Sequence, residues 1–170
     1  INEVELFPYK KLIDNNLSSV MVAHMEVPSL EKEPKMPSTL SKNIISKLLK
    51  KKLKFEGLVI TDAMDMKGVV DFNKNQSADV SALLAGNDIL LMPDDLDEST
   101  KSIRNAIDNG IISEKRLKYS VKKILMAKYK AGLHDINEII LDNIVEDMNS
   151  DVDKLLYEEI TEKSITLIKN

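Results

Sequence analysis

One carboxylate directly follows a pattern typical of a buried strand, a position where side chains often do chemistry. Residues 58–62 read "LVITD", so Asp62 comes after four apolar or β-branched residues that predict a strand. A carboxylate at a strand end either faces a polar pocket or caps the next helix, and capping is common after strands in α/β chains. The residues alone leave both interpretations open: a reactive carboxylate in a pocket, or a loop-closing cap.

Other residues of interest lie near predicted strand ends. The run "SSVMVAH" (18–24) ends in His24, and "DILLM" (88–92) ends in Met92. A lone histidine is more often a hydrogen-bonded structural residue than a base or ligand. A methionine beside a strand is more often a packing residue. We name His24 and Met64, which stands two residues after Asp62, as candidate substrate-binding residues; the alternatives are a structural histidine and a packing methionine.

The elements that must position these residues alternate along the chain. Short apolar runs predict strands over 18–24, 58–62 and 88–92. Apolar residues at helical spacing, with serine caps at Ser41 and Ser113, predict helices over 7–16, 42–54, 77–85, 96–109 and 113–131. This alternation predicts an α/β fold with a parallel sheet, and ligands bind such sheets at the carboxyl ends of the strands.

Composition excludes several classes of protein. The 170 residues are 43% hydrophobic and 31% charged, which is ordinary for a globular chain of about one domain. A net charge of −4 argues against a nucleic-acid partner, and the basic run "KLLKKKLK" (47–54) is interpreted as a solvated helix face rather than an anion-binding patch. Without cysteine there is no thiol nucleophile or thiolate metal site. No apolar run is long enough to span a membrane, and the compartment stays open.

The stretch "LLKKKLKFEGLVITDAMD" (48–65) resembles the active-site signature of family 3 glycoside hydrolases. In that signature an apolar pair and basic positions precede glycine, three apolar residues, Ser or Thr, and aspartate. The matching positions here are Leu48, Leu49, Lys50, Lys52, Gly57, Leu58, Val59, Ile60, Thr61 and Asp62. The segments 20–41, 81–93 and 116–133 also resemble this family, in its β-N-acetylhexosaminidase branch.

The resemblance implies a fold and a domain organisation. It implies a partial (β/α)8 barrel, with about three parallel strands and their covering helices, plus a helical C-terminal extension. Residues 1–134 would be the C-terminal half of the barrel, 135–163 a helical linker, and "SITLIKN" (164–170) a strand that starts a following α/β domain. A complete barrel of this type takes about 250 residues. Exposed barrel edges would favour self-association.

The resemblance also implies an activity and a missing partner residue. Asp62 would be the nucleophile of a retaining hydrolase that cleaves β-linked N-acetylhexosaminides, and no metal or other cofactor is expected. The family branch takes its acid/base histidine from a loop (Lys-His-Phe-Pro-Gly-His-Gly) that this sequence lacks. We therefore expect a fragment that is inactive alone. The alternatives are a non-catalytic carbohydrate-binding or partner-completed half-barrel, and an unrelated barrel lyase or isomerase that uses Asp62 as a base.

Overall fold

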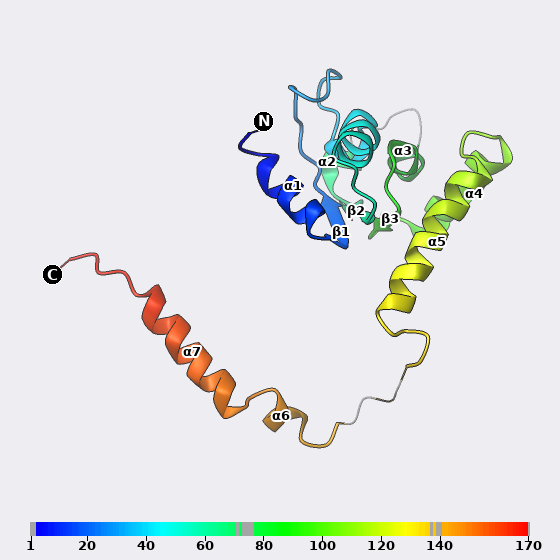
Figure 1. The fold of residues 1–170 in the computed structure, drawn as a ribbon. Helices are drawn as coiled ribbons and strands as arrows, with labels where there is room; N and C mark the ends of the chain where they lie inside the picture. The colour runs from blue at the N-terminus through cyan, green and yellow to red at the C-terminus, as the bar shows by residue number, and fades with distance from the viewer. Residues whose placement is uncertain (1–2, 71, 73–76, 137, 139–140, 170) are drawn as a thin grey trace. The chain divides into compact units, whose positions relative to one another are not determined.

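The structure, a computed structural model, describes residues 3–70, 72, 77–136, 138 and 141–169 (Figure 1). Its internal contacts divide the chain into two compact units, Ile1–Ala131 and Gly132–Asn170. The first unit is α/β, and the described part of the second contains only helices and irregular segments.

The first unit is built on a three-stranded parallel sheet. Its strands are β1 (Ser19–Val22), β2 (Leu58–Ala63) and β3 (Ile89–Leu91), in the order β1-β2-β3. The three predicted strands and the parallel α/β fold are therefore confirmed. Parallel strands need long crossover connections, and these carry the helices.

Helices fill the connections of the first unit. They are α1 (Phe7–Asp14), η1 (Ser38–Leu40), η2 (Asn43–Lys52), α2 (Lys67–Val70), α3 (Ala78–Ala85), α4 (Leu96–Asp108) and α5 (Glu114–Lys130). The Ser113 side chain caps α5 as predicted, since it accepts a hydrogen bond from the Arg116 backbone N–H. Within the ranges that the structure describes, no helix combines the length and the apolarity of a membrane span.

The helix predicted to follow Ser41 forms, but as a wider π-type helix, η2. Its hydrogen bonds include one from Leu53 N–H to the carbonyl five residues back, at Leu48. Ser41 Oγ accepts a hydrogen bond from Ile44 N–H at 3.2 Å, as a cap does. The solvated-face interpretation of 47–54 holds for the other lysines but not for Lys50, whose side chain is only 21% exposed.

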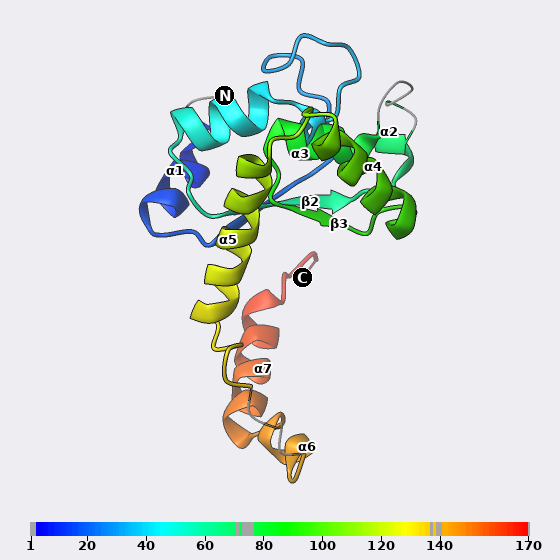
Figure 2. The ribbon, with the colours of Figure 1, turned by 90° about the vertical axis from the view of Figure 1, so that its right-hand side faces the viewer.

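One face of the sheet is covered by helices. Val59 of β2 is fully buried against residues of η2 and α3, which lie on the same side of the sheet in Figure 2. The alternation of a strand sends neighbouring side chains to the other face. There Met21 of β1 is 60% exposed. Within the first unit the sheet is thus packed against helices on one side and exposed on the other. In a closed barrel, the side without helices faces the barrel interior.

The second unit contains α6 (Ile144–Asp147) and α7 (Asp151–Ser164), with a capping box between Ser150 and Asp153 at the start of α7. The strand predicted over 164–170 is not formed: α7 includes Ser164, and 165–169 are irregular. An extended segment is a strand only when a neighbouring strand completes its hydrogen-bond ladder. The linker and next-domain boundaries stay predictions, and residues 137, 139, 140 and 170 of those segments lie outside the described residues.

Candidate active site

Asp62 lies at the carboxyl end of β2, on the side of the sheet that the helices leave open. Val59 and Thr61 are fully buried, whereas Ile60 and Asp62, which alternate with them, are half-buried. This alternation puts Asp62 on the same face as Ile60. Its Oδ1 accepts a hydrogen bond from the backbone N–H of Ala63 at 2.8 Å. The carboxylate is therefore held by a neighbouring backbone donor without being enclosed.

The N–H groups that a cap would use are engaged elsewhere. Met64 N–H donates to the carbonyl of Leu91 at 2.9 Å, and Asp65 N–H donates to the carbonyl of Met92 at 3.2 Å. These bonds extend the contact between β2 and the end of β3. A capping aspartate would accept hydrogen bonds from the first turn that follows it. The geometry around Asp62 therefore differs from that of the capping interpretation.

An irregularity in the sheet surrounds Asp62. Ile60 pairs with Ile89 and Ala63 pairs with Leu91, so β2 uses three residue steps where β3 uses two. Leu91 N–H donates to the side-chain Oγ1 of Thr61 at 2.9 Å. The hydroxyl acts as an acceptor within the irregular part of the ladder. Bulges of this kind re-aim side chains and are frequent beside active sites.

His24 follows β1 and contacts the end of β2. Its Nε2 lies 2.8 Å from the carbonyl oxygen of Ala63, and its Nδ1 lies 2.7 Å from Thr39 Oγ1. The structure therefore brings His24 beside the residue that follows Asp62, as the strand-end argument predicted. Both ring nitrogens are already engaged by the protein. A substrate contact by His24 stays a prediction.

The structure places the candidate Met64 and the strand-end residue Met92 differently. Met64 is 2% exposed and packs with Leu40, Val69 and Ala82 on the helix-covered side. Its side chain is thus part of the core, in line with the packing alternative and not with a substrate contact. Met92, at the end of β3, is 59% exposed and has a left-handed backbone with φ of 44°. That conformation is uncommon for a non-glycine residue, and residues in such conformations cluster at active sites and switch regions.

A second carboxylate, Asp88, lies at the opposite, amino end of the same strands. Its side chain is fully buried and forms ion pairs at 3.3 Å with Lys50, 2.8 Å with Lys123 and 3.6 Å with Arg116. Ser120 Oγ donates a hydrogen bond to it at 2.6 Å. This cluster, Asp88 with its three cations, joins η2 and α5 to the base of the sheet. The sequence analysis did not find it.

The cluster also pairs with the backbone and shifts two pKa values. Asp88 Oδ2 accepts a hydrogen bond from Val59 N–H at 3.1 Å. Burial alone would raise the pKa of Asp88, but hydrogen bonds from Lys123 and Ser120 and the charge of Lys50 hold that pKa below its usual value. Burial lowers the pKa of Lys50 to about 8, helped by the nearby charge of Lys123 and opposed by Asp88. One carboxylate thus compensates three partly dehydrated cations.

The motif that suggested the family has a physical role at several positions. Lys50 donates to the Asp88 carboxylate and to the Gly86 carbonyl. At Gly57 an added Cβ would lie 2.4 Å from the Ser18 carbonyl oxygen, so only glycine fits between β1 and β2 there. Thr61 supports the ladder beside Asp62. The signature therefore combines structural positions with one half-exposed carboxylate.

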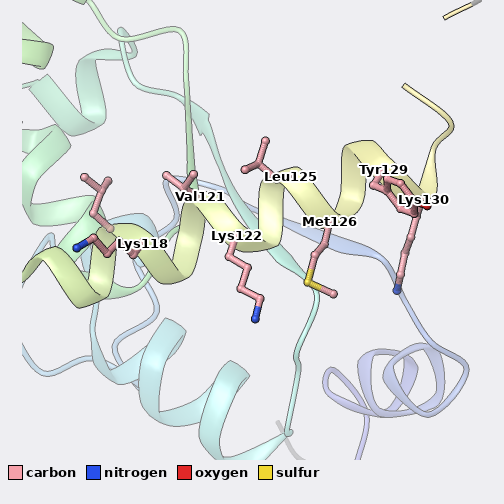
Figure 3. Close-up of a pocket in the computed structure, with 8 residues that line it drawn as sticks. Lys118, Val121, Lys122, Leu125, Met126, Tyr129 and Lys130 are labelled. Atoms are coloured by element: carbon pink, nitrogen blue, oxygen red, sulfur yellow. The ribbon is translucent and has the colours of Figure 1, made fainter. Parts of the chain in front are cut away.

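A separate groove of about 590 Å³ runs along α5 (Figure 3). It is lined by residues of this helix alone, namely Leu117, Lys118, Val121, Lys122, Leu125, Met126, Tyr129 and Lys130. This lining contains no carboxylate and no histidine. Its titratable side chains are lysines and one tyrosine from a single helix, without the histidine that most often serves as a general acid or base, so Asp62 remains the stronger candidate.

Comparison with known proteins decides the family. The model of the glycosyl hydrolase family 3 N-terminal domain matches residues 1–127. The chain belongs to glycoside hydrolase family 3. Its first unit is accordingly part of a family 3 barrel domain, which agrees with the three parallel strands and their helices.

Curated and solved relatives of this family 3 chain are longer proteins. A β-N-acetylglucosaminidase/β-glucosidase from Cellulomonas fimi is 27% identical over 95% of the chain and 30% of its own length. Beta-hexosaminidase A from Pseudoalteromonas piscicida is 25% identical over 100% of the chain and 31% of its own length. The solved family 3 β-N-acetylglucosaminidase from Paenibacillus sp. str. FPU-7 is 31% identical with a TM-score of 0.87, over 99% of the chain and 32% of that protein. The chain thus spans about a third of these relatives.

Proposed function

We propose that this family 3 chain carries the nucleophile of a retaining glycoside hydrolase that cleaves β-linked N-acetylhexosaminides. The observation that carries the proposal is the placement of Asp62. It is half-exposed at the carboxyl end of β2, held at 2.8 Å by Ala63 N–H, and positioned on the open face of a parallel sheet. Active sites of barrel enzymes lie at that end of the strands.

The proposed reaction has two displacement steps. In the first, an Asp62 oxygen forms a bond to the anomeric carbon while the bond from that carbon to the leaving oxygen breaks, and an acid protonates the leaving oxygen. In the second, water deprotonated by the same group attacks the anomeric carbon and releases Asp62. The acid/base group belongs, in this proposal, to a part of the barrel other than these three strands.

The substrate class comes from the relatives. The relatives described above are named for β-N-acetylglucosaminidase, β-hexosaminidase or β-glucosidase activity. We therefore propose a β-linked hexoside, with an N-acetylhexosaminide as the first substrate to test. We also propose the domain boundaries given above, with 1–134 as barrel, 135–163 as linker and 164–170 as the start of another domain.

An activated glycoside tests the nucleophile in this chain itself. A 2,4-dinitrophenyl 2-deoxy-2-fluoro-β-glucoside has a leaving group that departs without protonation, so a missing acid does not prevent the first step. We expect the 170-residue chain to gain one fluoroglycosyl group on Asp62, detected by intact-mass and peptide mass spectrometry. The Asp62→Asn variant should gain none.

Two controls separate the possible results. Asp65→Asn, which changes an exposed neighbouring carboxylate, should keep the labelling rate. Aryl β-N-acetylglucosaminides without activation should be hydrolysed by the chain at the background rate. Labelling at another residue in the Asp62→Asn variant would contradict the nucleophile assignment, and robust turnover of the unactivated substrate would contradict the missing acid/base.

The second candidate is a half-barrel that a partner chain or a second copy completes. It is favoured by the exposure of apolar side chains on the open face, where Met21 is 60% and Leu91 39% exposed. Unpaired strand edges and apolar faces promote association. Sedimentation should show concentration-dependent association of the chain, which Met21→Glu weakens. A compact monomer at all concentrations, with a sharp melting transition, would count against it.

A further inference from the structure

We propose that His24 is a positioning residue for Asp62, acting through the backbone of Ala63, whose carbonyl contacts His24 and whose N–H contacts Asp62. The inference rests on the proposed function, since it treats Asp62 as the nucleophile. It assigns His24 a role other than substrate contact. His24, Thr39 and Ala63 are together called the His24 clamp below.

The clamp holds the residue that in turn holds the carboxylate. Ala63 N–H donates to Asp62 Oδ1 at 2.8 Å, and the Ala63 carbonyl lies 2.8 Å from His24 Nε2. Ala63 is thus fixed on one side by a histidine from the segment after β1, while it orients the carboxylate with its own N–H. A nucleophile must be held in a narrow range of geometries, because a displacement of about 1 Å can cost about 10²-fold in rate.

Hydrogen-bond chemistry fixes the tautomer of the ring. A carbonyl oxygen only accepts, so His24 Nε2 must carry a hydrogen toward Ala63. In the neutral ring Nδ1 then accepts the hydroxyl hydrogen of Thr39, 2.7 Å away. In the protonated ring Nδ1–H donates to Thr39 Oγ1 instead, and the hydroxyl turns to the carbonyl of Val22 at 3.1 Å or Ala23 at 3.2 Å. The clamp is therefore satisfied in both protonation states.

Thr39 anchors the clamp in the core. It is fully buried, and its backbone carbonyl accepts a hydrogen bond from Asn87 Nδ2 at 2.9 Å. Asn87 is also fully buried and lies between α3 and β3. Positioning residues work when their own side chains are locked by surrounding contacts. The path from Asn87 through Thr39 and His24 to Ala63 meets that condition.

Nuclear magnetic resonance of the whole chain tests the clamp independently of catalysis. We expect the ¹⁵N shifts of His24 to show the Nε2–H tautomer in the neutral ring. His24→Ala should shift the Ala63 amide and the side-chain carboxyl carbon of Asp62. His134 is the other histidine of the sequence and belongs to the second unit. His134→Ala should therefore leave both signals in place.

The labelling assay with the activated fluoroglucoside measures the consequence. We expect His24→Ala to label about 10- to 100-fold more slowly than the unchanged chain, the penalty of a misplaced nucleophile. His24→Gln, which can still offer an N–H to the Ala63 carbonyl, should recover part of the rate. Thr39→Val should slow labelling and Thr39→Ser should not, because only serine retains the hydroxyl.

The outcomes separate this inference from the proposed function. If the unchanged chain is not labelled at Asp62, the proposed nucleophile is overturned, while the resonance shifts still decide whether the clamp holds Ala63. Unchanged Ala63 and Asp62 signals in His24→Ala would overturn the clamp. Equal labelling rates in His24→Ala and the unchanged chain would overturn its positioning role even where the signals move.

Discussion

Two aspartates of neighbouring strands lie at opposite ends of one sheet in contrasting surroundings. Asp88, just before β3, has a fully buried side chain that forms ion pairs with three cations. Asp62, at the end of β2, is half-exposed, accepts a hydrogen bond from Ala63 N–H, and forms no ion pair with any residue that the structure describes. The same side chain thus serves as a structural centre in one place and as an accessible group in the other.

The difference shows how a parallel sheet separates stability from chemistry. At the amino end, the Asp88 carboxylate joins η2, α5 and the first residues of β2 through charge-assisted hydrogen bonds from Lys50, Ser120, Lys123 and the Val59 N–H. At the carboxyl end, Asp62 is half-buried and accepts a hydrogen bond from the backbone N–H of Ala63. Barrel folds distribute these tasks in the same way, with stability at the bottom face and reactive residues at the top. A carboxylate whose oxygens are all engaged cannot attack a substrate, so Asp88 is excluded as the nucleophile.

The largest expected effect is on folding. Asp88→Asn removes the one negative charge that compensates Lys50, Lys123 and Arg116, and it should lower the free energy of unfolding by about 3–5 kcal/mol, the cost of leaving buried charges unpaired. Asp62→Asn should change it by less than about 1 kcal/mol, as half-exposed sites usually do. Urea titrations followed by amide signals of the first unit measure both.

A control separates the loss of the Asp88 charge from the loss of one hydrogen bond to Asp88. Ser120→Ala removes a hydrogen bond from a neutral donor to Asp88 and leaves the ion pairs in place, so it should cost about 1.5–3 kcal/mol, less than Asp88→Asn. If Asp62→Asn destabilised the first unit as much as Asp88→Asn, Asp62 would itself be a structural residue. The contrast between the two ends of the sheet would then disappear.

The sequence predicts the carboxyl end of the sheet better than the amino end. An apolar run followed by a polar residue is a local pattern, so the strand ends at His24, Asp62 and Met92 could be found from neighbouring residues. The Asp88 cluster has no such pattern. Its cations come from η2 and from α5, far away in the chain, and Lys50 stands in a run of similar lysines. Only the folded arrangement selects Lys50 from that run.

Two finer features also escape local reasoning. Asp62 and Met64 both follow "LVIT", and the sequence does not show that Asp62 is half-exposed while Met64 is buried. The pairing of β2 with β3 is irregular between Ile60 and Ala63, beside both residues. A bulge depends on the register with a neighbouring strand, which the sequence does not display. Likewise the contact of His24 with Ala63 joins residues 39 positions apart.

The smallest expected effect sharpens the comparison through pH. Burial lowers the pKa of Lys50 to about 8 in the folded chain, while an unfolded lysine keeps its proton to about pH 10.4. Between these values the unfolded state binds more protons than the folded state, so Lys50 makes the free energy of unfolding rise with pH. The rise should stay below about 1.4 kcal/mol per pH unit, the limit for one proton.

Lys50→Met isolates this contribution, because it removes the titrating group and keeps most of the buried alkyl chain. Urea titrations from pH 7.5 to 10 should show that the free energy of unfolding rises more steeply with pH in the unchanged chain than in Lys50→Met. Lys51→Met changes an exposed lysine of the same helix and should keep the slope of the unchanged chain. An equal slope in Lys50→Met would show that Lys50 keeps an ordinary pKa. The Lys50 ammonium group would then be hydrated like that of an exposed lysine, and the two ends of the sheet would not differ in how far they exclude water.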